Sequence, residues 1–282
     1  MEATRPDVLS AELGVLIPPG EDELPCDDGV PMETQRHFLQ LALLIDSLTL
    51  HWDNRDDFFV GGNMFVYYSL EQAEAVIREL EAEEEGKEAP PPEMRAFRGP
   101  DFFAVLDVPR HERKSWVIWE EGKGPDVVIE LLSASTAKAD KGKKKRIYQD
   151  QMRVPEYFWY DPFSGEWAGF GLSNGLYEPR EPDERGRLIS RKLGLALTRW
   201  EGEYKDVRAR WLRWETLEGV LLPTSQEMAA EEHRRAEEER RRAEEEHRRA
   251  EEERRRAEAE RQRTEEERRR ADELAAELAR YR

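Results

Sequence analysis

Two stretches, GPDFFAVL (Gly99–Leu106) and GPDVVIELLSAST (Gly124–Thr136), decide how this chain of 282 residues folds. Each opens with Gly-Pro-Asp and continues as an apolar run, which is typical of a β-strand bounded by turn residues. Glu130 stands in the middle of the second run, and a charge there is costly to bury unless another group pairs with it. The sequence therefore predicts two strands and a buried, partnered carboxylate.

The first aspartate and this glutamate form a candidate metal site. If the two strands pair, the carboxylates of Asp101 and Glu130 can point to one face and hold a hard cation such as Mg²⁺ (or Mn²⁺), which prefers oxygen ligands. Such a cation lowers the pKa of a bound water and stabilises charge that builds on a phosphate. Asp101 could instead be only a turn residue after proline. Turn chemistry does not explain an acid between Ile129 and Leu131.

Two roles are open for the aspartate of the second Gly-Pro-Asp. Asp126 lies four residues before Glu130 on the same strand, hence on the same face but roughly 13 Å away at 3.3 Å per residue. One metal ion is then not bound directly by both. Asp126 either positions the metal ligands without binding the metal itself or simply starts the strand, and we favour the structural role.

A lysine-rich segment follows the second strand, and we expect it to be a helix that ends near Gln151. Most of its lysines should form a solvated face, but one can extend over the carboxylates to orient water or neutralise a phosphate. Lys144 shares a helical face with Asp140 and Tyr148 through four-residue spacing, so burying Tyr148 would bring Lys144 to the sheet edge near Glu130. The run consists of Lys138, Lys141, Lys143, Lys144 and Lys145.

Composition limits the function classes. The net charge is −18, which argues against a protein that coats nucleic acid by bulk electrostatics, so any such attraction must be local or metal-mediated. The single cysteine, Cys26, excludes an internal disulfide framework and a cysteine-ligated zinc site. The five histidines show no ligand spacing, and we interpret them as structural or surface residues. No apolar run reaches membrane length and no leader is evident, so the expected location is cytoplasmic.

Pattern changes divide the chain into three parts: a loosely ordered lead-in (1–30), an α/β domain (31–224) and a charged helix (225–282). Within the domain, strand, helix and strand around the lysines predict a mixed central sheet flanked by helices. Helices are expected from Glu33 onward and over 71–85. Strands are expected over 63–69, 156–160, 167–172, 188–190 and 193–197.

The C-terminal part repeats a seven-residue unit close to AEEERRR. Glutamate precedes arginine by four residues, as in Glu237–Arg241, Glu245–Arg249 and Glu252–Arg256, which favours a helix. A coiled coil wants two apolar positions per heptad, and this repeat offers one alanine. Two interpretations stay open: a solvated single helix, or a weak coiled-coil stalk that makes a homo-oligomer. Over about 50 residues the helix would reach roughly 75 Å.

Taken together, four segments resemble the Uma2 family of restriction-endonuclease-like proteins, with the PD-(D/E)XK nuclease fold. The resemblance implies metal-dependent hydrolysis of phosphodiester bonds in DNA. Asp101 matches the aspartate of the PD element and Glu130 the acid of the (D/E)XK element. Leu132 stands where the generic pattern has lysine; the family places its lysine on the next helix, at the position of Lys144, although neighbouring lysines stay alternatives. The segments are Gly99–Asp101, Gly124–Thr136, Asp140–Gln149 and Pro155–Pro162.

Two functions therefore compete at this point. The first is a Mg²⁺-dependent endonuclease in which Asp101 and Glu130 hold the metal and Lys144 is catalytic. An acid of the first helix, Glu33 or Asp46, could complete the metal shell. The second is a non-catalytic interaction or scaffold protein that keeps the nuclease fold and uses the long C-terminal helix as its working surface.

Overall fold

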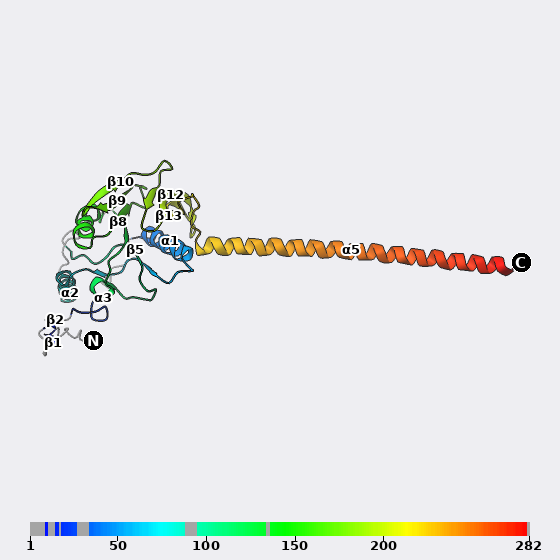
Figure 1. Cartoon of the computed structure of the whole chain (residues 1–282), viewed down its shortest axis with the longest axis horizontal. Helices are drawn as coiled ribbons and strands as arrows, with labels where there is room; N and C mark the ends of the chain where they lie inside the picture. The colour runs from blue at the N-terminus through cyan, green and yellow to red at the C-terminus, as the bar shows by residue number, and fades with distance from the viewer. Residues whose placement is uncertain are drawn as a thin grey trace. The chain divides into compact units, whose positions relative to one another are not determined.

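The computed structural model describes residues 9–10, 15–16, 18–26, 34–87, 95–133 and 136–280 (Figure 1). Contacts divide the chain into two units, Met1–Ser225 and Gln226–Arg282. The first unit is a mixed α/β structure, and the second consists of the rest of one long helix.

A mixed six-stranded sheet forms the centre of the first unit. Strands β7 and β8 run parallel, and every other neighbouring pair is antiparallel. The expected mixed central sheet is confirmed, and the two Gly-Pro-Asp strands, β5 and β7, are neighbours. In spatial order the strands are β10 (Leu176–Arg180), β9 (Trp167–Ser173), β8 (Glu156–Tyr160), β7 (Val127–Leu131), β5 (Phe102–Leu106) and β3 (Phe58–Gly61).

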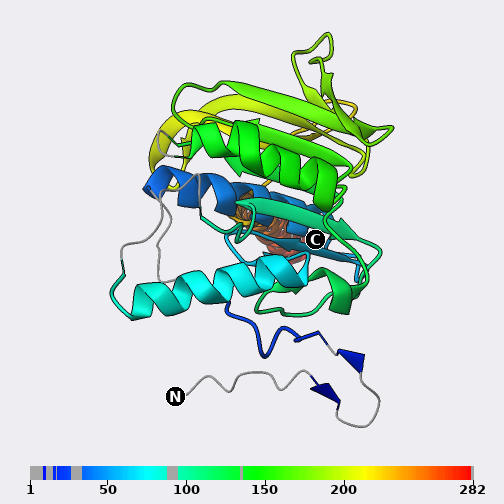
Figure 2. The same ribbon diagram turned by 90° about the vertical axis from the view of Figure 1, so that its left-hand side faces the viewer.

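The crossover between the parallel strands is helical, because parallel neighbours cannot be joined by a tight hairpin. A short α4 (Ala137–Ala139) leads into two π-helical segments, η1 (Asp140–Lys144) and η2 (Ile147–Gln151). Figure 2 shows this crossover (green) as a helix separate from α1 (Gln35–His51, blue) and α2 (Leu70–Glu84, cyan). The predicted lysine-rich helix is therefore present, with wider turns than an α-helix.

Side-chain alternation assigns the two faces of the sheet to different cores. Phe102, Ile129 and Phe158 pack in one cluster with leucines of α1. Val128, one residue from Ile129, packs on the opposite face in a cluster that contains Tyr148 of η2. Because successive side chains of a strand point to opposite faces, Glu130 belongs to the face of Val128. The strand thus aims its carboxylate at the crossover helix.

A second, three-stranded sheet consists of β11 (Leu188–Ser190), β12 (Leu195–Tyr204) and β13 (Val207–Thr216). The last two form a long hairpin whose turn residues, Lys205 and Asp206, have φ of +50° and +61°. Positive φ at both central residues is the signature of a type I′ turn. The sequence prediction found only the first part of β12 and missed β13. The period-two alternation of VRARWLRW (207–214) was the available signal.

Shorter elements complete the unit. The strand predicted over 63–69 is reduced to β4 (Val66–Tyr67), while β3 and β10 were not predicted. Part of the lead-in is packed rather than loose, because Leu24 is buried and the Tyr67 hydroxyl donates to the Pro25 carbonyl, 2.5 Å away. Strand β6 (Trp116–Val117) pairs with β4 in parallel and leads into α3 (Ile118–Glu121). The remaining strands, β1 (Leu9–Ser10) and β2 (Val15–Leu16), pair with each other.

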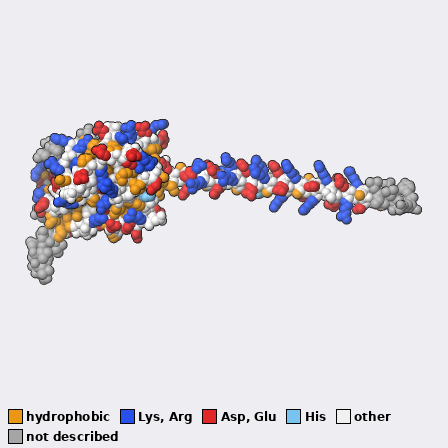
Figure 3. Space-filling model, turned by 45° about the horizontal axis from the view of Figure 1, so that its top comes forward, with side chains coloured by type: hydrophobic (Ala, Val, Ile, Leu, Met, Phe, Trp, Pro, Cys, Tyr) orange, Lys and Arg blue, Asp and Glu red, His pale blue; other side chains and the backbone are white. Residues whose placement is uncertain are grey.

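The long helix α5 (Ser225–Arg280) contains 56 residues, and acidic and basic side chains alternate along it (Figure 3). Of the described residues, those that pair include Arg235 with Glu231 and Arg269 with Glu265, in the expected orientation. The three pairs that the sequence suggested do not form ion pairs among these residues. The physical reason is that an exposed pair gains little from direct contact, because water solvates both charges and holding two long side chains in one geometry costs entropy.

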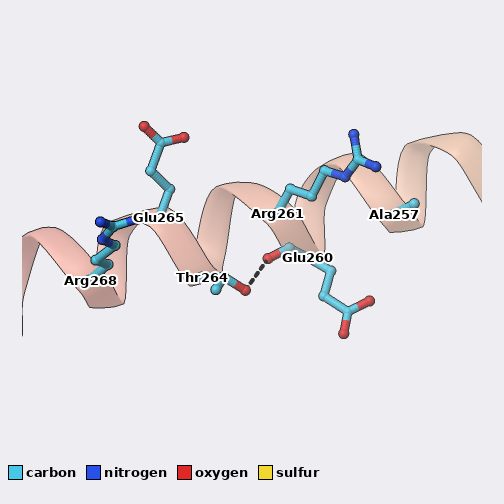
Figure 4. Close-up of a pocket in the computed structure, with 6 residues that line it drawn as sticks. All are labelled: Ala257, Glu260, Arg261, Thr264, Glu265 and Arg268. Atoms are coloured by element: carbon cyan, nitrogen blue, oxygen red, sulfur yellow. Dashed lines mark hydrogen bonds between the residues drawn. The ribbon is translucent and has the colours of Figure 1, made fainter.

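Surface hollows on α5 are gaps between its own side chains. One lies between Ala257 and Arg268. Among the residues that line it, the Thr264 hydroxyl donates a hydrogen bond to the Glu260 carbonyl, at 2.9 Å (Figure 4). Of the helices that the structure describes, none is both long and apolar enough to cross a membrane.

Candidate active site

The two Gly-Pro-Asp aspartates bind the opposite ends of one strand pair. Asp101, just before β5, accepts a hydrogen bond through Oδ2 from the Leu131 backbone N–H at the end of β7, at 2.7 Å. Asp126, just before β7, accepts one through Oδ2 from the Leu106 N–H at the end of β5, at 2.8 Å. Each carboxylate thereby accepts a hydrogen bond from a strand-end N–H group that the backbone of the neighbouring strand does not pair. The predicted pairing of the two strands is confirmed.

Glu130 is the deepest acid of this region. Its side chain has no exposed surface. The Tyr148 hydroxyl donates to Oε1, and the Lys144 ammonium donates to Oε2 from 3.1 Å. Burial raises the pKa of Glu130 well above its ordinary value, although Lys144 opposes this shift. The expectation of a buried carboxylate with a partner is met by two side chains of the crossover helix.

Lys144 lies between two buried carboxylates. Its Nζ is 3.1 Å from Glu130 Oε2 and 2.8 Å from Asp140 Oδ1. The contact with Asp140 is an ion pair without the alignment of a hydrogen bond. Burial by itself would lower the pKa of Lys144, but Glu130, Asp140 and Asp101 together raise it, so the side chain stays an ammonium. About a quarter of the side chain (24%) is exposed.

The other lysines of the run have different surroundings. Lys143 donates to the Arg95 carbonyl at 2.6 Å. Lys141 lies over the Trp159 ring and Lys145 over the Phe170 ring, with Nζ 4.1 Å and 3.4 Å from the ring centroids. Lys138 is exposed. Of the five, Lys144 is the lysine that contacts Glu130.

Asp140, Lys144 and Tyr148 come together because residues four apart lie on one face of a helix. Asp140 and Lys144 belong to one π-helical segment of the crossover and Tyr148 to the other. π-Helical turns are rare and concentrate at functional sites. The shared face was predicted from the sequence, but no role was predicted for Asp140 or Tyr148. The four-residue spacing was the signal that could have identified them.

Three acids considered from the sequence lie elsewhere or cannot be placed. Asp126 is buried between Lys123 (2.8 Å) and Lys192 (3.4 Å), which agrees with a structural role. Asp46 accepts from the Ser225 backbone N–H at 2.8 Å, so its carboxylate is bound at the start of α5. Glu33 lies outside the described residues.

A cleft of about 230 Å³ leads to the Lys144 side chain. Arg95, Arg98 and Lys143 also line it, together with Gly99 just before the first aspartate. Gly99 has no room for a side chain, because an added Cβ would lie 2.0 Å from the Met64 carbonyl oxygen. Part of this basic lining is already paired, since Arg98 Nη2 lies 3.6 Å from Glu83 Oε1 and Lys144 contacts two carboxylates.

The donor set suits a hard divalent cation. Asp101, Glu130 and Asp140 act on one another electrostatically, and all three act on the single ammonium of Lys144. Because burial raises the pKa of Glu130 and of Asp140, these carboxylates favour a proton or another positive charge beside them. Mg²⁺ usually takes one or two carboxylates and keeps water for its remaining positions. Among the described residues no three acids, histidines or cysteines stand close enough to form a full protein cage.

Comparison with known families agrees with this arrangement. A model of the Uma2 family, described as "putative restriction endonuclease", matches residues 27–201. The chain belongs to the Uma2 family. The match covers both Gly-Pro-Asp strands, the crossover helix and β8, and hence every residue of the candidate site. Among curated proteins, none matches the chain at a significant level.

Proposed function

We propose that this Uma2 protein is a metal-dependent endonuclease that hydrolyses phosphodiester bonds in DNA, with Mg²⁺ or Mn²⁺ as its cofactor. Asp101 and Glu130 are the proposed metal ligands, and Lys144 is the proposed catalytic cation. The observation that carries the proposal is Glu130, a fully buried acid in a central strand with Lys144 3.1 Å from it. A buried ion pair adds little to stability compared with apolar residues, so its presence calls for another reason.

The fold supports the same conclusion. A mixed sheet in which a helix crosses between two parallel strands, with an acid on the first of them, is what a PD-(D/E)XK core requires. The site lies at the carboxyl end of β7, the edge at which open α/β sheets bind ligands.

When bound, Mg²⁺ or Mn²⁺ would activate a water molecule and offset the charge of the phosphate. Asp101 holds its carboxylate in place through the Leu131 N–H, and Glu130 does so through Tyr148. An ammonium has three donors, and Lys144 directs one of them to Glu130 in a hydrogen bond, which leaves donors for water or for a phosphate oxygen in the cleft. The largest single contribution that a partly buried ammonium can make to catalysis is to stabilise the negative charge that develops on the phosphate.

The test is a cleavage assay on supercoiled plasmid and on single-stranded DNA, with Mg²⁺ or Mn²⁺, for the wild type and Glu130→Gln. Glutamine keeps the shape and removes the charge. We expect cleavage by the wild type alone. No cleavage with either metal, or equal cleavage by both proteins, would overturn the proposal, provided that both proteins unfold cooperatively.

The competing proposal is a non-catalytic scaffold. Its support is α5 (56 residues), in which nearly all the side chains that the structure describes are exposed and offer a long charged surface. Under this alternative the protein cuts no DNA, and removal of residues 226–282 abolishes binding to a partner. The same cleavage assay separates the two functions.

A further inference from the structure

Phe163 has a large apolar side chain that is exposed to solvent. It is 67% exposed, in the turn between β8 and β9. Asp161 fixes this turn, since its Oδ1 accepts from the backbone N–H groups of Phe163 (2.8 Å) and Ser164 (3.2 Å). Gly165 completes the turn with φ of +74°. Because backbone bonds and the Asp161 carboxylate define the turn, the Phe163 ring is not needed for it.

The turn lies at the same sheet edge as the candidate active site. Strands β7 and β8 are parallel, so Glu130, near the end of β7, and the turn after β8 share one edge. His37 links the two. Its ring centroid lies 5.8 Å from that of Phe163, and its Nε2 lies 3.1 Å from the carbonyl oxygen of Leu132, two residues after Glu130.

Two cations lie near the turn that carries the exposed ring. Arg36 donates to the Pro162 carbonyl at 3.3 Å, and its guanidinium lies over the Trp211 ring at 4.3 Å. Lys141 is exposed over Trp159 and is close enough to act on Asp161, two residues before Phe163. The Asp161 charge is itself held by donors within the turn, which include the Ser164 hydroxyl at 2.7 Å. The turn therefore presents an exposed aromatic ring, with one cation bound to the carbonyl of residue 162 and another near the carboxylate of residue 161.

We propose that Phe163 stacks on an unpaired base of the DNA strand that enters the active site, while Arg36 and Lys141 contact phosphates on either side. This inference rests on the proposed nuclease function and adds to it the substrate class: single-stranded DNA, or duplex DNA with an unpaired base near the cut. Stacking on exposed aromatic rings beside cationic groups is the general way in which proteins hold single strands. In an intact duplex both faces of each base are already stacked, so the ring gains little there.

Binding without metal tests this inference apart from cleavage. The affinity of the wild type, Phe163→Ala and Phe163→Trp is measured in EDTA by fluorescence anisotropy. The probes are a labelled 15-nucleotide single strand and the same strand annealed to its complement. Leu176→Ala is the matched control, because Leu176 is equally exposed (63%) but lies on the edge strand β10.

We expect Phe163→Ala to weaken single-strand binding roughly 5- to 140-fold, the effect of losing one stacked base. Phe163→Trp should restore it, and duplex binding and Leu176→Ala should change by less than about 3-fold. Unchanged single-strand binding by Phe163→Ala, or an equal loss for strand and duplex, would overturn the inference. If the proposed nuclease function fails, neither the wild type nor any variant cleaves DNA. The dependence of binding on Phe163 is measured without cleavage, so the two failures are distinguishable.

Discussion

Lys144 and Glu130 form an ion pair across the space between the crossover helix and the central sheet, with Nζ 3.1 Å from Oε2. The two residues are 14 positions apart in sequence. The pair exists because the β7 alternation turns Glu130 toward the helix and because four-residue spacing puts Lys144 on the same helix face as the buried Tyr148. It gives the buried acid a partner and leaves the ammonium a path to solvent.

The two capping aspartates offer a matched comparison. Asp101→Asn and Asp126→Asn both keep a side-chain oxygen that can accept the strand-end N–H, and both remove the charge. We expect Asp101→Asn to lower the cleavage rate at least about 100-fold, because it removes a proposed metal ligand. Asp126→Asn should keep the rate within about 3-fold and cost about 1–2 kcal/mol of unfolding free energy, since its carboxylate holds Lys123 and Lys192. Plasmid cleavage and urea denaturation measure the two effects. Similar losses of cleavage in both variants would contradict separate roles for the two aspartates.

Adjacent lysines provide a second comparison. Lys144→Gln should lower the cleavage rate roughly 10²- to 10³-fold, the usual effect of losing one charge-stabilising group. Lys145→Gln should have little effect, because Lys145 lies over the Phe170 ring instead of the carboxylates. Single-turnover cleavage at saturating Mg²⁺ is the measurement, and circular dichroism checks that both variants are folded. If Lys145→Gln reduced the rate as much as Lys144→Gln, the assignment within the lysine run would be wrong.

The pH dependence of stability follows from the raised pKa of Glu130. The folded state then binds its proton more tightly than the unfolded state does, so this group stabilises the fold below the ordinary glutamate pKa of about 4.5. That stability is lost as the pH rises from there through the pKa of Glu130 in the folded protein. Glu130→Gln has no such proton, so the variant should gain stability relative to the wild type between pH 5 and pH 8.

Urea denaturation of both proteins in EDTA measures this difference. EDTA removes divalent ions, whose binding would oppose protonation of the same carboxylate. A difference between the two proteins that is constant over this pH range, or that changes in the other direction, contradicts a raised pKa of Glu130.

The last prediction concerns α5. A peptide of residues 226–282 should be helical, and its helicity should fall when NaCl is raised from 10 mM to 1 M, because salt screens pairs such as Glu231–Arg235. We expect the helicity to be independent of peptide concentration, since one alanine per heptad buries little apolar surface. Far-ultraviolet circular dichroism and sedimentation equilibrium test this. A helical signal that rises with concentration would favour the homo-oligomeric stalk.

The sequence allowed much of the central sheet to be predicted, because buried strands carry local signals. Apolar runs after turn residues identified β5 and β7, and EYFWY identified β8. Strands without that signal were missed. For example, β10 is an edge strand that contains a proline and is largely exposed, so little in its composition marks it as a strand. The β12–β13 hairpin turns on Lys205-Asp206 rather than on an Asn-Gly pair, which removes the strongest hairpin signal.

By itself, the sequence determined that an acid would be buried at Glu130 and would need a partner, because burying a charge alone is too costly for any fold. It could not determine which of five lysines is that partner. Their local sequence is nearly uniform, and the choice depends on helical turns and on the register of the helix over the sheet. Tertiary structure also decided that Asp101 and Asp126 would cap one strand pair from opposite ends, since that relationship exists only once β5 and β7 lie antiparallel.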